Sequence, residues 1–170
     1  LGDVYKRQSF DMLVVDEVGE LAIAHGLDEG AFEEPVVVSV GTEPYALDTA
    51  DLDLDANLDV VVVDQASNQV HVLMNEGAGV LSEPVAWDVG AGPRDMRLAD
   101  VDGDQTVDVI TADFFDDTIT VLSGAGDGTF GEPQTWLAGL GAYAVRPVDV
   151  DEDGDVDLVV AASVSDAVWI

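Results

Sequence analysis

Residues 149–159 read D-V-D-E-D-G-D-V-D-L-V, and this stretch decides the fold. Two related stretches precede it: D-L-D-L-D-A-N-L-D from Asp51 and D-V-D-G-D-Q-T-V-D from Asp100. The three acidic segments begin at 51, 100 and 149, so a constant step of 49 residues separates them. A fixed step of about 40–50 residues is the sequence signature of a repeat array.

Other markers follow the same step. Glu-Pro pairs recur at 34–35, 83–84 and 132–133, and Trp87 recurs as Trp136. A weaker, earlier copy includes residues 10–13. These markers predict a single repeat domain over 9–170, with units at about 9–50, 51–99, 100–148 and 149–170. Residues 1–8 fit two alternatives equally well, a leader foreign to the repeat or a degenerate terminal copy.

Each repeat predicts four short strands and no helix. In the best-preserved copy we expect strands over 94–99, 107–113, 119–123 and 133–137, with turn residues between them. The run Val60–Val63 is apolar on both faces, so both faces of that strand must be covered. Radially packed four-stranded sheets provide such cover, and the period fits a β-propeller. The sequence therefore predicts an all-β fold.

The length predicts a partial propeller. The 170 residues hold about three and a half 49-residue units, whereas propellers typically have 4–8 blades. The last expected strand includes Ile170, the final residue of the sequence. We therefore expect a fragment of a longer array, with about three and a half four-stranded blades.

The acidic loops predict calcium sites. Calcium is coordinated by 6–8 oxygen ligands. Aspartates at alternate positions of a tight loop can supply several of them, and the backbone carbonyl of position 7 can supply another. Magnesium is less favoured, and the loops lack the position-12 Glu of an EF-hand. Loop three carries Gly at position 6, whereas loop one has no Gly at positions 4 and 6, and loop two has Gln105 at position 6. Because Gly suits a positive φ, loops one and two are expected to bind more weakly. The candidate ligands at positions 1, 3, 5, 7 and 9 are Asp51, Asp53, Asp55, Asn57 and Asp59; Asp100, Asp102, Asp104, Thr106 and Asp108; and Asp149, Asp151, Asp153, Asp155 and Asp157.

The chain resembles the FG-GAP/VCBS repeat family, the calcium-loop repeats of integrin-α-like β-propellers. That family's loop runs D-x-D-G-D-G-x-x-D-[LIV]-[VA] and is followed by a strand and a G-[DN]-G-x-G-x-F turn. Residues 149–159 match the loop, and residues 124–130 match the turn. The resemblance covers roughly 10–170. It implies a seven-bladed parent, structural calcium in the hairpin loops and an extracellular or cell-surface setting.

Composition excludes several partners. The 36 acidic and 5 basic residues give a net charge of −31, which disfavours nucleic acid and anionic membranes as partners. No apolar run approaches the ~20 residues of a membrane helix, and cysteine is absent. The acid excess fits either solubility or life in salty water, where salt screens self-repulsion.

The turns at the ends of the blades opposite the acidic loops suggest a partner surface. Exposed aromatic and arginine side chains are the usual anchors of an interface, although ordinary turn positions would also explain them. The candidates are Tyr45, Arg94, Phe114, Phe115 and Tyr143.

No catalytic motif stands out in the sequence. We therefore expect a non-catalytic, calcium-stabilised extracellular module that binds a protein or a polysaccharide. One alternative is a propeller appended to a secreted hydrolase or lyase whose catalytic domain lies outside these residues. Another is a purely structural spacer.

Overall fold

The computed structural model describes residues 12–16, 18–27, 31–77, 80–165 and 167–170. The expectation for residues 1–8 lies outside these ranges. Within them every regular element is a β-strand, as the sequence predicts. The strands are β1 (Met12–Val15), β2 (Glu20–Ala24), β3 (Val36–Ser39), β4 (Pro44–Ala50), β5 (Asp59–Asp64), β6 (Gln69–Leu73), β7 (Val85–Asp88), β8 (Pro93–Ala99), β9 (Asp108–Asp113), β10 (Thr118–Leu122), β11 (Gln134–Leu137), β12 (Ala142–Val148), β13 (Asp157–Ala162) and β14 (Ala167–Trp169).

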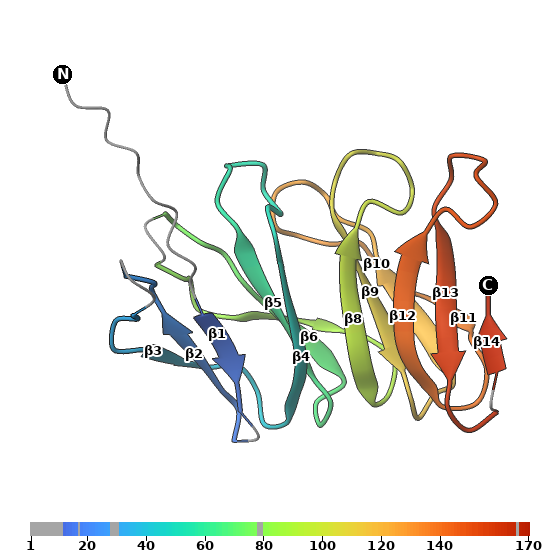
Figure 1. The fold of residues 1–170 in the computed structure, drawn as a ribbon, viewed down its shortest axis with the longest axis horizontal. Helices are drawn as coiled ribbons and strands as arrows, with labels where there is room; N and C mark the ends of the chain where they lie inside the picture. The colour runs from blue at the N-terminus through green and yellow to red at the C-terminus, as the bar shows by residue number, and fades with distance from the viewer. Residues whose placement is uncertain (1–11, 17, 28–30, 78–79, 166) are drawn as a thin grey trace.

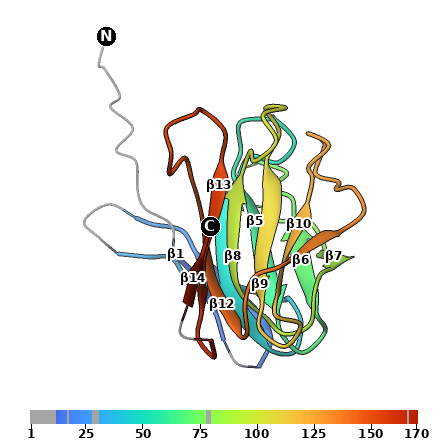
Figure 2. The ribbon, with the colours of Figure 1, turned by 90° about the vertical axis from the view of Figure 1, so that its right-hand side faces the viewer.

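The strands form four antiparallel sheets. The two central sheets have four strands each, β4-β5-β6-β7 and β8-β9-β10-β11, and the outer sheets are β1-β2-β3 and β12-β13-β14. Figure 1 shows the sheets following one another across the molecule like the blades of a propeller, and the described sheets do not close into a ring. The first strands of neighbouring sheets, β4, β8 and β12, lie next to one another, and Figure 2 gives the end-on view.

The 49-residue step is kept in the structure. The first strands of three successive sheets begin at Pro44, Pro93 and Ala142. The four strands expected over 94–137 match β8 to β11 to within one residue at each boundary. The fold class predicted from the sequence, an all-β repeat, is therefore confirmed.

Strand β5 is buried on both faces, as its sequence predicts. Val61 and Val63 belong to a core shared with the β8–β11 sheet, where they lie with Met96. Val60 and Val62 belong to the core shared with the β1–β3 sheet. All four valines of the strand are at most 3% exposed. At about 1.5–3 kcal/mol per buried side chain, these cores hold the neighbouring sheets together and so fix the relative positions of the loops at the sheet ends.

Candidate metal centres

The three acidic loops connect the first and second strands of three successive sheets. They span 51–58, 100–107 and 149–156. The last residue of the first strand pairs with the aspartate that opens the second strand, as Ala50 does with Asp59. The loops are therefore the tips of antiparallel hairpins, and all three lie at the same end of the molecule, the upper end in Figure 1.

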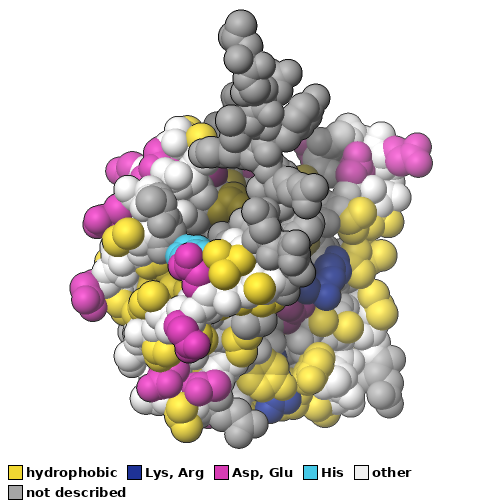
Figure 3. All heavy atoms as spheres, turned by 60° about the vertical axis from the view of Figure 1, so that its left-hand side comes forward, with side chains coloured by type: hydrophobic (Ala, Val, Ile, Leu, Met, Phe, Trp, Pro, Cys, Tyr) yellow, Lys and Arg dark blue, Asp and Glu magenta, His cyan; other side chains and the backbone are white. Residues whose placement is uncertain are grey.

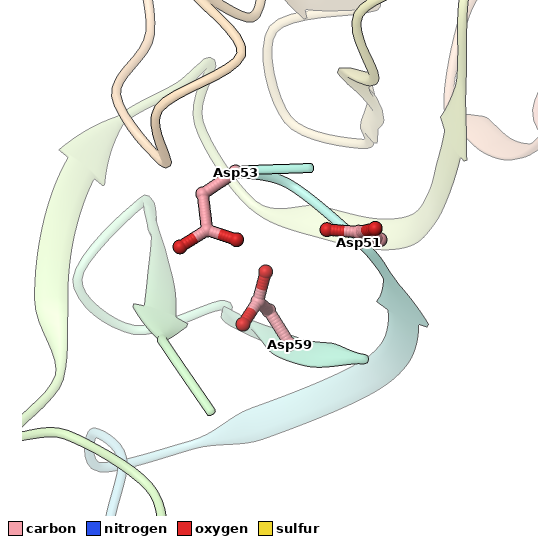
Figure 4. Close-up of side chains that lie close together, drawn as sticks. All are labelled: Asp51, Asp53 and Asp59. Carbon is pink, nitrogen blue, oxygen red and sulfur yellow. The ribbon is translucent and has the colours of Figure 1, made fainter. Parts of the chain in front are cut away.

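Three carboxylates converge in each loop, and they come from positions 1, 3 and 9. In loop one, oxygens of Asp51, Asp53 and Asp59 lie within 4.8 Å of one another. Figure 4 shows these three side chains facing a common space between the loop and the start of β5. The corresponding clusters in loops two and three are Asp100, Asp102 and Asp108, and Asp149, Asp151 and Asp157.

The position-9 aspartate anchors the loop to two backbone segments. Asp59 is only 1% exposed. Its Oδ2 accepts a hydrogen bond from the backbone N–H of Leu52 at 2.9 Å, and its Oδ1 accepts one from Asn75 at 2.8 Å. Asp108 does the same with Val101 and Gly124. In loops one and two, the carboxylate at this position therefore fixes the loop against the turn that follows the third strand.

The position-5 aspartates are not among the three converging carboxylates, although the side chains of Asp55 and Asp104 interact with the position-3 aspartates of their loops. Asp55 accepts hydrogen bonds from both the backbone and the side chain of Asn57, at 2.7 and 2.8 Å. Asp104 accepts the backbone N–H and the hydroxyl of Thr106. The third loop repeats the backbone contact with Asp153 and Asp155. Of the expected ligands, the carboxylates at positions 1, 3 and 9 converge on one another. The carboxylate at position 5 accepts a hydrogen bond from the residue at position 7.

The backbone of each loop is left-handed at positions 4 and 6. In loop one, Leu54 has φ 62° and Ala56 has φ 71°; in loop two, Gln105 at position 6 has φ 73°. A residue with a Cβ costs about 1–2 kcal/mol in this region. Position 6 of loop three is Gly154, with φ 97°, which carries no such penalty. The sequence prediction that these positions need a positive φ is confirmed.

The clustered charges oppose one another. Burial raises the pKa of Asp108, the backbone hydrogen bonds it accepts lower it in part, and the charges of Asp102 and Asp104 raise it again. A bound cation would reverse this balance, because an opposite charge within a few ångströms favours the ionised carboxylate.

The donor set fits a hard cation. Each cluster presents only carboxylate oxygens, which suit calcium, magnesium or manganese rather than zinc or copper. The chain has no cysteine, and His71 lies against Asp64, near the far end of β5. Three carboxylates on a tight hairpin, supplemented by loop carbonyls, could therefore hold calcium.

At the opposite end of the sheets, the five candidate partner residues come together, although the first and the last of them are 98 positions apart in the chain. The guanidinium carbon of Arg94 lies 3.7 Å from the ring centre of Phe114 and 5.6 Å from that of Phe115. It lies 5.9 Å from the ring of Tyr45 and 5.8 Å from that of Tyr143. The two tyrosine hydroxyls are 3.5 Å apart, and this contact is the main reason that the pKa of Tyr45 is raised. We call these five residues the Arg94 cluster.

Two buried aspartates at the ends of β5 and β9 are not among the candidate residues. Asp64 accepts backbone hydrogen bonds from Thr42 and Glu43, and Asp113 accepts hydroxyls from Thr111 and Thr120. The two aspartates are one repeat step apart, at 64 and 113. That spacing was the signal that could have identified them.

Comparison with known proteins agrees with the geometry. No helix long and apolar enough to cross a membrane occurs in the described part of the chain. No curated protein matches the sequence. The family model for the FG-GAP-like repeat matches twice, at residues 51–111 and 100–160. Each match begins at the first aspartate of an acidic loop and extends into the second strand of the next sheet, and together they cover 51–160. The chain therefore belongs to the FG-GAP-like repeat family.

Proposed function

We propose that this chain is a calcium-stabilised, extracellular module of the β-propeller type that binds a protein or polysaccharide partner and is not itself a catalyst. The observation that carries the proposal is the convergence of three carboxylates in each of three successive hairpin loops. Acidic side chains are common on surfaces, but the same three-carboxylate cluster at the same hairpin position is not expected from surface charge alone.

Calcium would order the hairpin tips and the backbone contacts of the position-9 aspartates beneath them. Asp51, Asp53 and Asp59 would hold it in loop one, and their counterparts would hold it in the other two loops. Three ions would change the formal charge from −31 to −25. For a dissociation constant of about 10⁻⁴ M, calcium at about 1 mM stabilises the folded state by about 1.4 kcal/mol per site.

Weak calcium sites would suit an extracellular setting. Sites of this kind in extracellular modules bind calcium at roughly 10⁻⁴–10⁻³ M. The medium outside cells supplies that concentration, whereas the cytosol does not. The family membership supports the same location, because FG-GAP repeats are typical of extracellular proteins.

The binding role is supported by the division between the two ends of the sheets. The carboxylates at one end are committed to loop structure through the hydrogen bonds of Asp51, Asp59 and their counterparts. The other end presents half-exposed aromatic side chains, Tyr45, Phe115 and Tyr143. Partly exposed aromatic rings beside an arginine are the composition of interface anchors.

Two measurements test the proposal. Thermal melts in calcium, in magnesium and in a chelator should show a higher Tm in calcium than in either other condition. Arrays of extracellular proteins and polysaccharides, probed in calcium and in a chelator, should show capture that depends on calcium. Equal melts in all three conditions would contradict the calcium role, and array silence with an intact calcium response would contradict the binding role in favour of a structural spacer.

A further inference from the structure

The Arg94 cluster contains the one basic side chain, among those the structure describes, that has no acidic partner. The described basic residues are Arg94, Arg97 and Arg146, all on β8 and β12. Arg97 and Arg146 both pair with Asp95, at 2.9 and 2.6 Å. No described carboxylate lies within ion-pair distance of Arg94, although the chain carries 36 acidic residues.

The acidic residues nearest to Arg94 along these elements are occupied elsewhere. Asp116 accepts the backbone N–H of Ala91 at 2.8 Å. Asp117 accepts that of Gly141 at 2.6 Å. Asp95 holds the other two arginines. Among the described residues, no carboxylate therefore pairs with the charge of Arg94.

The guanidinium of Arg94 is packed against an aromatic ring, and one of its donors has no described acceptor. The ring of Phe114 lies over the guanidinium at 3.7 Å and holds it in place. The Nε of Arg94 is buried, and no described group accepts a hydrogen bond from it. A planar guanidinium with unused donors is suited to bidentate recognition of a carboxylate. Figure 3 shows basic side chains at two places on this side of the molecule, with hydrophobic side chains beside both.

We propose that the Arg94 cluster is a recognition site for a carboxylate carried by a protein segment. The ion pair would form at Arg94, and the exposed rings of Tyr45, Phe115 and Tyr143 would contact the apolar groups around the carboxylate. This inference rests on the binding function proposed above, for which it names the surface and the chemistry of the partner.

Charge complementarity favours a protein segment over an acidic polysaccharide. A net charge of −31 repels a chain that repeats a negative charge. A cavity of about 540 Å³ adjoins Tyr45 and is also lined by Glu43. The carboxylate of Glu43 and the guanidinium of Arg94 therefore both lie near the ring of Tyr45. That arrangement suits a segment with a carboxylate beside a cation, which polypeptides offer and polyuronates do not.

Side-chain nuclear magnetic resonance of arginine tests the proposal on the whole chain in calcium. The chain has four arginines, so the ¹H–¹⁵N spectrum of their Nε groups is simple. The probes are N-acetyl-leucine, its uncharged counterpart N-acetyl-leucinamide, and glucuronate as a sugar carboxylate. N-acetyl-leucine should shift the Arg94 signal saturably, with a dissociation constant on the order of 1–10 mM.

Two variants provide the controls. Arg94→Gln should weaken the binding of N-acetyl-leucine by about tenfold or more. Because this variant lacks the Arg94 signal, its binding is measured from the chemical shifts of backbone amides around Phe115. Arg146→Gln removes an arginine of the neighbouring sheet that already has a carboxylate partner, so it should leave the affinity unchanged. If Arg94→Gln fails to fold, the titration of the unchanged chain still decides the question.

Three results would overturn the proposal: no shift of the Arg94 signal, an equal shift with N-acetyl-leucinamide, or tighter binding of glucuronate than of N-acetyl-leucine. Each is distinguishable from failure of the proposed function, because the calcium melts and the arrays are read independently of this titration. A silent Arg94 with positive arrays would place the partner site elsewhere on the module.

Discussion

Gly128 donates its backbone N–H to the carbonyl oxygen of Leu52, at 3.2 Å, across the boundary between two sheets. Leu52 belongs to the acidic loop of the β4–β7 sheet, and Gly128 belongs to the turn between β10 and β11. The same turn begins at Gly124, which donates to Asp108 in the acidic loop of its own sheet. One turn therefore contacts two candidate calcium sites in neighbouring sheets.

This connection predicts that calcium protects a backbone amide outside the acidic loops. Order in loop one should slow hydrogen exchange at Gly128, because its acceptor, Leu52, lies between two of the clustered aspartates. Exchange measured by nuclear magnetic resonance, with and without calcium, should show the effect. An Asp53→Asn variant should abolish it at Gly128.

The matched control is the amide of Val89, which donates to the carbonyl of Asn68 at the other end of the sheet. Calcium should protect it only as far as it raises the stability of the whole chain. Equal protection at Val89 and Gly128, unaffected by Asp53→Asn, would show that the turn carries no specific connection to loop one.

The left-handed residues of loop one predict a stabilising glycine substitution. Ala56 has φ 71°, so Ala56→Gly should raise the free energy of unfolding by about 1 kcal/mol through relief of the Cβ penalty. Denaturant titration in calcium measures the change. The calcium affinity of loop one should rise with it, because the loop is then less strained when ordered.

Ala66 supplies the control for that substitution. It lies in the turn after β5 and is not among the described residues with a positive φ. Ala66→Gly should therefore be neutral or destabilising, since glycine gains nothing there and costs conformational entropy in folding. A stabilisation equal to that of Ala56→Gly would contradict the strain argument.

Asp64 and Asp113 occupy the same repeat position but predict opposite responses to pH. Burial raises the pKa of Asp64, but four hydrogen bonds outweigh it, and the net pKa lies below the ordinary value of 3.8. Its carboxylate therefore stabilises the fold at pH values above 3.8, and this contribution is lost as the pH falls through the lowered pKa. Asp64→Asn should cost about 2 kcal/mol at neutral pH.

For Asp113 the pKa shift, and with it the dependence of stability on pH, has the opposite sign. Burial raises its pKa above 3.8, and the hydroxyls of Thr120, Thr111 and Thr118 offset this only in part. The ionised form is therefore disfavoured in the fold, and stability is lost as the pH rises from 3.8 through the raised pKa. Because threonine hydroxyls can rotate to accept as well as donate, Asp113→Asn should be neutral or stabilising at neutral pH. Unfolding of both variants across pH checks the pair, and equal destabilisation would contradict it.

Most of the fold was predictable because the repeat supplies several copies of one pattern. The four strands over 94–137 follow from β-branched runs and turn residues, and the double burial of β5 follows from Val60–Val63. The requirement for a positive φ at positions 4 and 6 follows from Gly103 and Gly154, which occupy those positions in loops two and three.

Part of the site could not be predicted from the sequence. The alternation of aspartates treats positions 1, 3, 5 and 9 alike, whereas each group of three converging carboxylates comes from positions 1, 3 and 9, and Asp55 accepts two hydrogen bonds from Asn57. Local competition between a side chain and the backbone two residues away decides that outcome. The meeting of Tyr45 and Tyr143 depends on how three sheets pack side by side, which no local pattern encodes.

Calcium titration by calorimetry, on chelator-stripped protein with a parallel melt, tests the central claim most directly. The unchanged chain should bind three ions, and Tm should rise by about 3–6 °C per site at about 1 mM calcium. Asp102→Asn should bind two ions, because it removes a carboxylate from loop two. Glu132→Gln, which removes one exposed acidic charge outside the three clusters, should still bind three. Absence of heat and an unchanged Tm would contradict the account and leave the acidic loops as surface turns that hold no ion.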